Sequence, residues 1–100
     1  MQNMHDTQEA TTTPISILIA DDHPPILAGL ASLINSMSGF RLLGQASTGQ
    51  QALELYQRLR PDVVLMDLNL PEMNGVLAIE HICAWDADAR IVILTTSQGE

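Results

Sequence analysis

Three apolar runs of this chain each end on a polar residue that carries a side-chain oxygen. The first run closes on Asp21 and Asp22, the second on Asp67 and the third on Thr95. Because the carboxyl ends of parallel strands meet at one edge of an open α/β sheet, where ligands bind, we expect these side chains to lie together. Carboxylates at such close spacing repel one another, and a hard divalent cation relieves the repulsion. The pattern therefore predicts a Mg²⁺ site at the edge of a parallel sheet.

The composition restricts the class of protein. One hundred residues, 46% hydrophobic and 16% charged, suit one packed domain. A net charge of −8 would repel nucleic-acid phosphates, so DNA binding by this segment alone is disfavoured. No apolar run approaches the roughly 20 residues that span a bilayer, and residues 1–14 lack the features of a signal peptide. We expect a soluble, cytoplasmic protein with no membrane segment.

Strand and helix patterns alternate along the chain after a polar start. Residues 1–14 are rich in threonine and lack periodicity, which predicts a flexible leader. From residue 15 onward, nearly continuous apolar runs typical of buried strands alternate with helical periodicities. The expected strands are 15–20, 40–47, 63–66 and 91–95, and the expected helices begin near Pro24, follow Thr48-Gly49 and run from about Val76 to Trp85. This alternation predicts right-handed crossovers and a parallel sheet with helices on both faces.

Helical spacing also predicts which side chains each helix buries. The first helix is expected to bury Ile26, Leu27, Leu30, Leu33, Ile34 and Met37. The second is expected to bury Ala52, Leu53, Tyr56 and Leu59, and the third Val76, Ile79, Ile82 and Cys83.

The polar residues at the sheet edge suggest a chemistry. Asp21 and Asp22 would hold Mg²⁺, one of them through water, while Asp67 would both ligate the metal and present an oxygen to a phosphorus centre. Such an attack depends mainly on alignment and charge neutralisation, and its product is an aspartyl phosphate. Thr95 can donate a hydrogen bond to a phosphoryl oxygen. Structural alternatives exist, since the Asp pair can cap a helix, Asp67 can form a turn and Thr95 can bond to backbone.

Three motifs together resemble a known family. Asp21-Asp22-His23-Pro24, the run 64–75 and Ile93-Leu94-Thr95-Thr96 resemble the receiver domain of bacterial two-component response regulators. The NarL/FixJ (LuxR-type) branch is the most similar, and the resemblance covers about residues 15–100. It implies a flavodoxin-like fold with the strand order 2-1-3-4-5.

The resemblance also implies roles for individual residues. Asp67 becomes the acceptor of a phosphoryl group from the phosphohistidine of a sensor histidine kinase. The Mg²⁺ ligands become Asp21, Asp22, Asp67 and the backbone carbonyl of Asn69, and Thr95 becomes the switch hydroxyl. His23 is expected only to begin the first helix. Such a domain phosphorylates itself with Mg²⁺, is not a turnover enzyme, and switches a DNA-binding transcription effector.

The sequence departs from the family pattern after the strand at 91–95. It has no counterpart of the fifth strand, of the fourth and fifth helices, or of the lysine that contacts the phosphoryl group, and it contains no lysine at all. Residues 15–100 are therefore expected to form an incomplete receiver domain in which the strand at 91–95 is an exposed apolar edge. Such an edge favours self-association, as a homodimer through that strand or the first helix, or implies a longer protein. DNA contact would need a C-terminal helix-turn-helix outside this sequence.

The missing lysine also bears on activity. We expect metal binding to survive its absence more readily than phosphorylation, because one phosphate-neutralising charge is lacking. Two other functions remain open at this point. One is a phosphorylation-independent dimerisation or interaction module with a degraded receiver fold. The other is a metal-dependent phosphohydrolase, which would need an acidic residue at the position held by Asn69.

Overall fold

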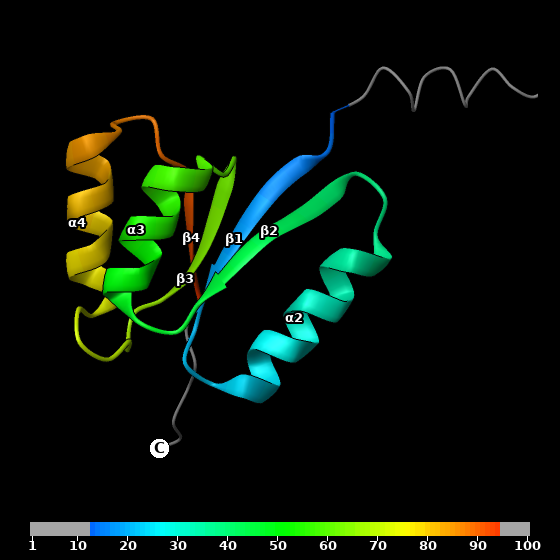
Figure 1. Ribbon diagram of the computed structural model, residues 1–100, viewed down its shortest axis with the longest axis horizontal. Coiled ribbons are helices and arrows are strands. Elements are labelled where there is room, and N and C mark those ends of the chain that lie inside the picture. The colour runs from blue at the N-terminus through cyan, green and yellow to red at the C-terminus, as the bar shows by residue number, and fades with distance from the viewer. Residues whose placement is uncertain (1–12, 95–100) are drawn as a thin grey trace, which may run out of the picture.

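The computed structural model of this chain describes residues 13–94, which form a four-stranded parallel sheet and three helices (Figure 1). In chain order the elements are β1 (Ile15–Ala20), α2 (Pro24–Ser36), β2 (Phe40–Ala46), α3 (Gly49–Leu59), β3 (Val63–Asp67), α4 (Gly75–Trp85) and β4 (Ile91–Leu94). The strand order is β2-β1-β3-β4, and each neighbouring pair is parallel. The predicted α/β, flavodoxin-like arrangement with the order 2-1-3-4 is confirmed.

The helices cover opposite faces of the sheet, as expected. Figure 1 shows α2 on one side of the strands and α3 with α4 on the other. Along β1 the side chains alternate between these faces. Ile17 and Ile19 pack with α2 around Ile34, whereas Leu18 and Ala20 join the larger cluster beneath α3 and α4. Both faces of β1 are therefore buried, which explains its continuous apolar sequence.

The buried face of α2 is narrower than the periodicity predicted. Ile34 is 4% exposed, but Leu33 is 55% and Met37 38% exposed, so the prediction was wrong for the last two. The helix ends at Ser36, and Met37 adopts an extended backbone as its C-cap. Leu33 lies about 100° around the helix from Ile34, and this rotation turns it away from the sheet.

Helical periodicity predicted the buried face of α4 wrongly at Val76 and Cys83. Ala78 and Ile82 are fully buried, whereas Val76 is 50% exposed and Cys83 is also exposed. The helix packs against both the sheet and α3. An alanine fits at the close contact that this double packing creates, so the small residue and not the valine lies inside.

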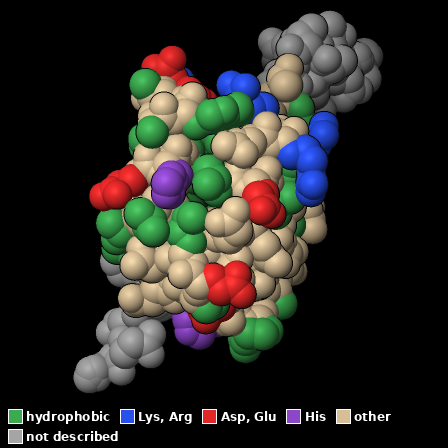
Figure 2. Space-filling view, turned by 60° about the vertical axis from the view of Figure 1, so that its left-hand side comes forward, with side chains coloured by type: hydrophobic (Ala, Val, Ile, Leu, Met, Phe, Trp, Pro, Cys, Tyr) green, Lys and Arg blue, Asp and Glu red, His purple; other side chains and the backbone are tan. Residues whose placement is uncertain are grey.

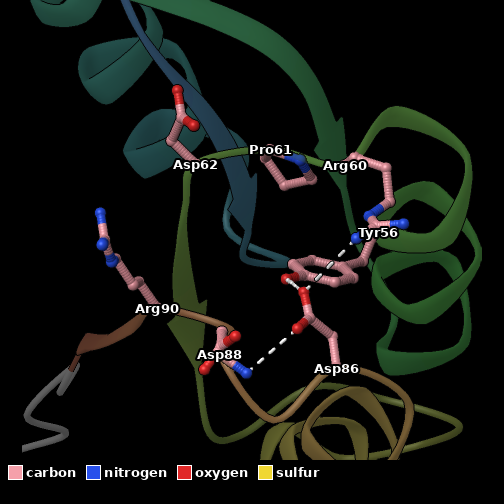
Figure 3. A pocket seen from close by; sticks show the side chains of 7 residues that line it. All are labelled: Tyr56, Arg60, Pro61, Asp62, Asp86, Asp88 and Arg90. Carbon is pink, nitrogen blue, oxygen red and sulfur yellow. Dashed lines mark hydrogen bonds and ion pairs between the residues drawn. The ribbon is translucent and has the colours of Figure 1, made fainter.

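The amino-terminal end of the sheet carries a cluster that joins the ends of α3 and α4 (Figure 3). The Tyr56 hydroxyl donates a hydrogen bond to Asp86 Oδ2 at 2.7 Å. The Tyr56 and Trp85 rings are nearly perpendicular with their centres 6.1 Å apart, and the Arg60 guanidinium lies 4.7 Å from the centre of the Trp85 ring. Burial and the bond to Asp86 raise the pKa of Tyr56 to about 12. The same bond lowers the pKa of Asp86.

Some expectations fall wholly or partly outside the described residues. Of the expected leader at 1–14, only Thr13 and Pro14 are described, so its flexibility remains a prediction. β4 is described to Leu94, and Thr95 lies beyond it. Within 13–94, no helix has both the length and the apolar character to cross a membrane.

Candidate functional site

Two carboxylates lie side by side where β1 and β3 end. Asp21 directly follows β1, and Asp67 is the last residue of β3. The two strands are neighbours in the sheet, and their last paired residues are Ala20 and Met66. The backbone N–H of Asp21 donates to the carbonyl of Ala46 at 2.9 Å, which holds the start of the loop against β2. The parallel register therefore delivers both side chains to one edge.

The predicted acidic residues gather there. Asp21, Asp22 and Asp67, together with His23, each offer a ligand atom, and these four atoms lie within 4.8 Å of one another. The side chains of Asp21 and Asp67 are buried, whereas that of Asp22 is 35% exposed. The cluster is thus closed on the protein side and open toward solvent beside Asp22.

His23 belongs to this cluster, and sequence reasoning assigned it only to the start of a helix. Its Nδ1 atom lies 2.7 Å from Asp21 Oδ1, 3.3 Å from Asp22 Oδ1 and 3.7 Å from Asp67 Oδ2. His23 is indeed the N-cap residue of α2, but its side chain makes no capping hydrogen bond. The hydrogen bond to Asp21 raises the pKa of His23, and the charges of the three carboxylates act in the same direction, against the lowering effect of burial.

The signal that would have revealed His23 is its position directly after the aspartate pair. Its backbone N–H donates to Asp21 Oδ1 at 2.8 Å, which turns the chain back on itself at the helix start. This turn brings the imidazole over the preceding carboxylates.

Two carboxylate oxygens of the cluster lack hydrogen-bond partners. Asp21 Oδ2 and Asp67 Oδ2 are buried, and no donor among the described residues reaches either one. A buried carboxylate oxygen without a partner is costly, because it has lost water and gained nothing in exchange. Hard oxygen ligands of this kind suit Mg²⁺, so the residues present fit a divalent cation.

The loop between β3 and α4 positions Asp67. The backbone N–H of Asn69 donates to Asp67 Oδ1 at 3.0 Å, which leaves Oδ2 as the oxygen without a partner. The N–H of Gly75 donates to the carbonyl of Leu68 at 2.9 Å. A Cβ atom at Gly75 would collide with the carbonyl oxygen of Asp67, so glycine is required for this close return of the loop. The carbonyl of Asn69 lies in this loop, and its role as a metal ligand remains a prediction.

Thr95 lies outside the described residues, so its role as a switch hydroxyl also remains a prediction. The last described residue of β4, Leu94, pairs with Asp67 in the parallel register. The carboxyl end of β4 therefore reaches the same edge as the acidic cluster.

Comparisons with known proteins agree with this arrangement. A family model for the response regulator receiver domain matches residues 17–100. The nitrate/nitrite response regulator protein NarL of Escherichia coli is 38% identical over 87 residues, which are 87% of this chain and 40% of NarL. The chain therefore spans well under half the length of this relative.

Solved structures give the same result. A LuxR-family two-component response regulator from an Aurantimonas species aligns with a TM-score of 0.79 and 39% identity, covering 87% of this chain and 62% of that one. A CheX–CheY–BeF₃–Mg²⁺ complex from Borrelia burgdorferi aligns with a TM-score of 0.80 and 26% identity, covering 97% of this chain and 70% of that one. With the matched family model, the shared strand order and NarL-like relatives, this chain belongs to the response regulator receiver domain family.

Proposed function

We propose that this chain is a phosphoryl-accepting receiver domain, and that Asp67 takes the phosphoryl group from the phosphohistidine of a sensor histidine kinase. The observation that carries the proposal is the pair of buried carboxylates at the ends of β1 and β3, each with one oxygen that lacks a partner. A purely structural Asp at either position would be expected to have both oxygens satisfied.

The metal in this proposal is Mg²⁺. Asp21, Asp22 and Asp67 would hold it through side-chain oxygens, and Asn69 through its backbone carbonyl. When bound, Mg²⁺ supplies positive charge that offsets the carboxylates and the incoming phosphoryl oxygens. The presence of BeF₃ and Mg²⁺ in the similar CheY complex supports this assignment.

Asp67 is oriented for attack by its own loop. The hydrogen bond from the Asn69 N–H engages Oδ1, so Oδ2, which is buried and has no partner among the described residues, would be the nucleophile. In the transfer, a bond forms between Asp67 Oδ2 and phosphorus while the phosphorus–nitrogen bond of the phosphohistidine breaks, and its electrons return to the imidazole of the kinase. Burial of Asp67 excludes water from its inner side, which strengthens the electrostatic interactions at the acceptor.

His23 has a supporting part in the state without metal. Its ring lies among the three carboxylates and, when protonated, offsets their mutual repulsion. The imidazole would have to move away when a cation takes that place.

The remaining features of the proposal concern the whole protein. The receiver would act in the cytoplasm as a self-phosphorylating switch and not as a turnover enzyme. Phosphorylation would switch the activity of a DNA-binding transcription effector. That effector, and not this acidic sequence, would contact DNA. Self-association would use the apolar surface at β4, where Val92 and Ile93 are 50% and 49% exposed, or the surface of α2 around Leu33.

That exposed apolar surface also favours a second candidate, an interaction module that works without phosphorylation. The two candidates differ at Asp67. Replacement of Asp67 by alanine would abolish switching in the first and leave partner binding intact in the second. A phosphohydrolase has no such support, because the position of its general acid is the amide Asn69.

The experiment is phosphorylation by a small phosphodonor. The chain is incubated with acetyl phosphate, with and without Mg²⁺, and its intact mass is followed. We expect slow addition of a single phosphoryl group that requires Mg²⁺ and is lost in Asp67→Asn, slow because the chain has no lysine. Asp62→Asn, a change of the same charge at the opposite end of β3, is the matched control. Labelling that persists in Asp67→Asn would overturn the proposal.

A further inference from the structure

The positive side chains of this chain are concentrated at one end of the sheet. Its only Lys or Arg residues are Arg41, Arg58, Arg60 and Arg90, against twelve acidic residues. Arg41 lies at the start of β2, Arg58 and Arg60 at the end of α3, and Arg90 immediately before β4. All these positions are at the amino-terminal edge of the sheet, opposite the acidic cluster. In Figure 2 the visible Lys and Arg side chains form two groups, both in the upper part of the face.

Three of the four arginines line one groove. Arg41, Arg58 and Arg60 surround a cavity of about 380 Å³, together with Leu43, Leu59 and Asp62. We propose that this groove binds a small multivalent phosphate anion, of the inorganic diphosphate or nucleotide diphosphate type. The site is separate from the proposed phosphoryl acceptor and does not depend on it.

The carboxylate in the groove is already engaged. Asp62 Oδ2 accepts hydrogen bonds from the backbone N–H and the hydroxyl of Ser16, at 2.8 and 3.0 Å. These bonds lower the pKa of Asp62, and the charge of Arg90 contributes to the same effect. Asp62 therefore remains an anion tied to β1, and it is the single carboxylate in a groove lined by three arginines.

Arg60 is partly committed elsewhere. It lies 3.8 Å from Asp86 Oδ2 and stacks over Trp85. Figure 3 shows its side chain directed toward Tyr56 and Asp86 on the neighbouring side of the same end. The side chain is 61% exposed, so it still contributes positive charge to the groove. The groove consequently presents Arg41 and Arg58 as its main cations, with Arg60 beside them.

Helix electrostatics explain only part of this arrangement. Arg58 lies in the last turn of α3, where a cation stabilises the helix end. Arg60 is the C-cap residue of the same helix. Arg41, however, is on the edge strand β2, paired in register with Ser16, and has no helix end to stabilise. Arg41 nevertheless lines the same groove as Arg58 and Arg60, and a shared anion would account for that.

The chemistry of the groove selects phosphate. Guanidinium groups donate paired hydrogen bonds that match phosphate oxygens, and several such groups favour an anion with more than one charge. The volume is at the small end of the range for ligand pockets, which suits a diphosphate. Leu43 and Leu59 supply a limited apolar wall against which the rest of a phosphate ester could lie.

The test is calorimetric titration of sodium diphosphate into the 100-residue chain at low salt, in EDTA, so that no metal-bridged binding to the acidic cluster occurs. A second titration with adenosine diphosphate distinguishes a free anion from a nucleotide. We expect saturable binding that Arg41→Gln and Arg58→Gln each weaken about fivefold, the size of one exposed charge-assisted contact. Trp85 fluorescence verifies that each variant is folded.

Arg90→Gln is the matched control, because it removes the same charge from the same end of the sheet; Arg90 does not line the groove, although its charge reaches Asp62. It should change the affinity less than twofold. Equal weakening by Arg90→Gln would mean that binding follows overall charge, and absence of saturable binding would mean that there is no site. Either result overturns the inference. Asp67→Asn should leave diphosphate binding unchanged, which separates this test from that of the proposed function.

Discussion

The Nδ1 atom of His23 lies 2.7 Å from Oδ1 of Asp21, a carboxylate that is completely buried. This contact, with the longer ones to Asp22 and Asp67, makes the imidazole the partner of an acidic cluster. The ring and a divalent cation would compete for the same carboxylates.

Removal of that ring is expected to strengthen the effect of Mg²⁺. In His23→Ala, the rise in melting temperature caused by Mg²⁺ should be larger than in the unmodified chain, because the cation no longer displaces a hydrogen-bonded partner. The start of α2 should be unaffected, since the His23 side chain makes no capping bond. Thermal unfolding with and without Mg²⁺ measures the difference. His81→Ala, at an exposed position on α4, is the control. A smaller Mg²⁺ effect in His23→Ala would show that the imidazole assists the metal.

Neutralising Asp67 is expected to stabilise the chain when no metal is bound. Asp67→Asn removes one of two buried like charges, and we expect the free energy of unfolding to rise by about 1 kcal/mol. A change of that size corresponds to a rise in melting temperature of about 4–8 °C for a domain of this length. Thermal unfolding in EDTA measures it. A lower melting temperature would mean that the charge of Asp67 is well compensated in the metal-free fold.

The tyrosine at the opposite end of the sheet gives a pH-dependent prediction. In the folded chain the pKa of the Tyr56 phenol is raised to about 12, from the ordinary tyrosine value of 10.0. Between these two pH values the folded protein binds more protons than the unfolded protein. The contribution of Tyr56 to the free energy of unfolding is therefore fully present below pH 10 and is lost as the pH rises toward 12.

The ultraviolet absorbance of phenolate follows this titration, and Tyr56 is the single tyrosine in the chain. Asp86→Asn should lower the pKa of Tyr56, because the carboxylate that accepts its hydrogen bond helps to raise it. A Tyr56 phenol that loses its proton near pH 10 in the folded chain would contradict the prediction.

The apolar surface at β4 predicts self-association. Val92 and Val76 are both 50% exposed, Val92 on β4 and Val76 on α4. Sedimentation should show that Val92→Lys shifts the monomer–oligomer equilibrium toward the monomer. Val76→Lys should leave this equilibrium as it is in the unmodified chain. Leu33→Lys then tests whether α2 takes part. A compact monomer with cooperative unfolding in the unmodified chain would contradict the prediction.

The fold could be predicted because its strands are buried on both faces. Such strands have continuous apolar sequences, as in β1 and β3, and the polar residue at each carboxyl end marks the sheet edge. The helix faces were harder to predict, since periodicity gives a stripe but not the neighbour that covers it. Val76 and Ala78 both fit a helical stripe, and only the close packing of α4 on α3 decides between them.

The acidic cluster followed from strand spacing, but the place of His23 did not. Its role depends on the backbone turn after Asp21, which brings the ring back over the carboxylates. Sequence spacing identifies residues that share an edge, and it does not reveal side-chain direction within a turn. The arginine groove was missed for a similar reason, because Arg41 and Arg58 meet only through the crossover from β2 to α3.

Calorimetric titration of Mg²⁺ tests the central claim most directly, namely that the carboxylates at the ends of β1 and β3 form a cation site. We expect one binding event, weakened at least about tenfold by Asp21→Asn, because one ligand oxygen and its charge are lost. Asp88→Asn, the same charge change at an exposed position outside the cluster, should leave the affinity unchanged. Equal affinities for Asp21→Asn and the unmodified chain would contradict the account.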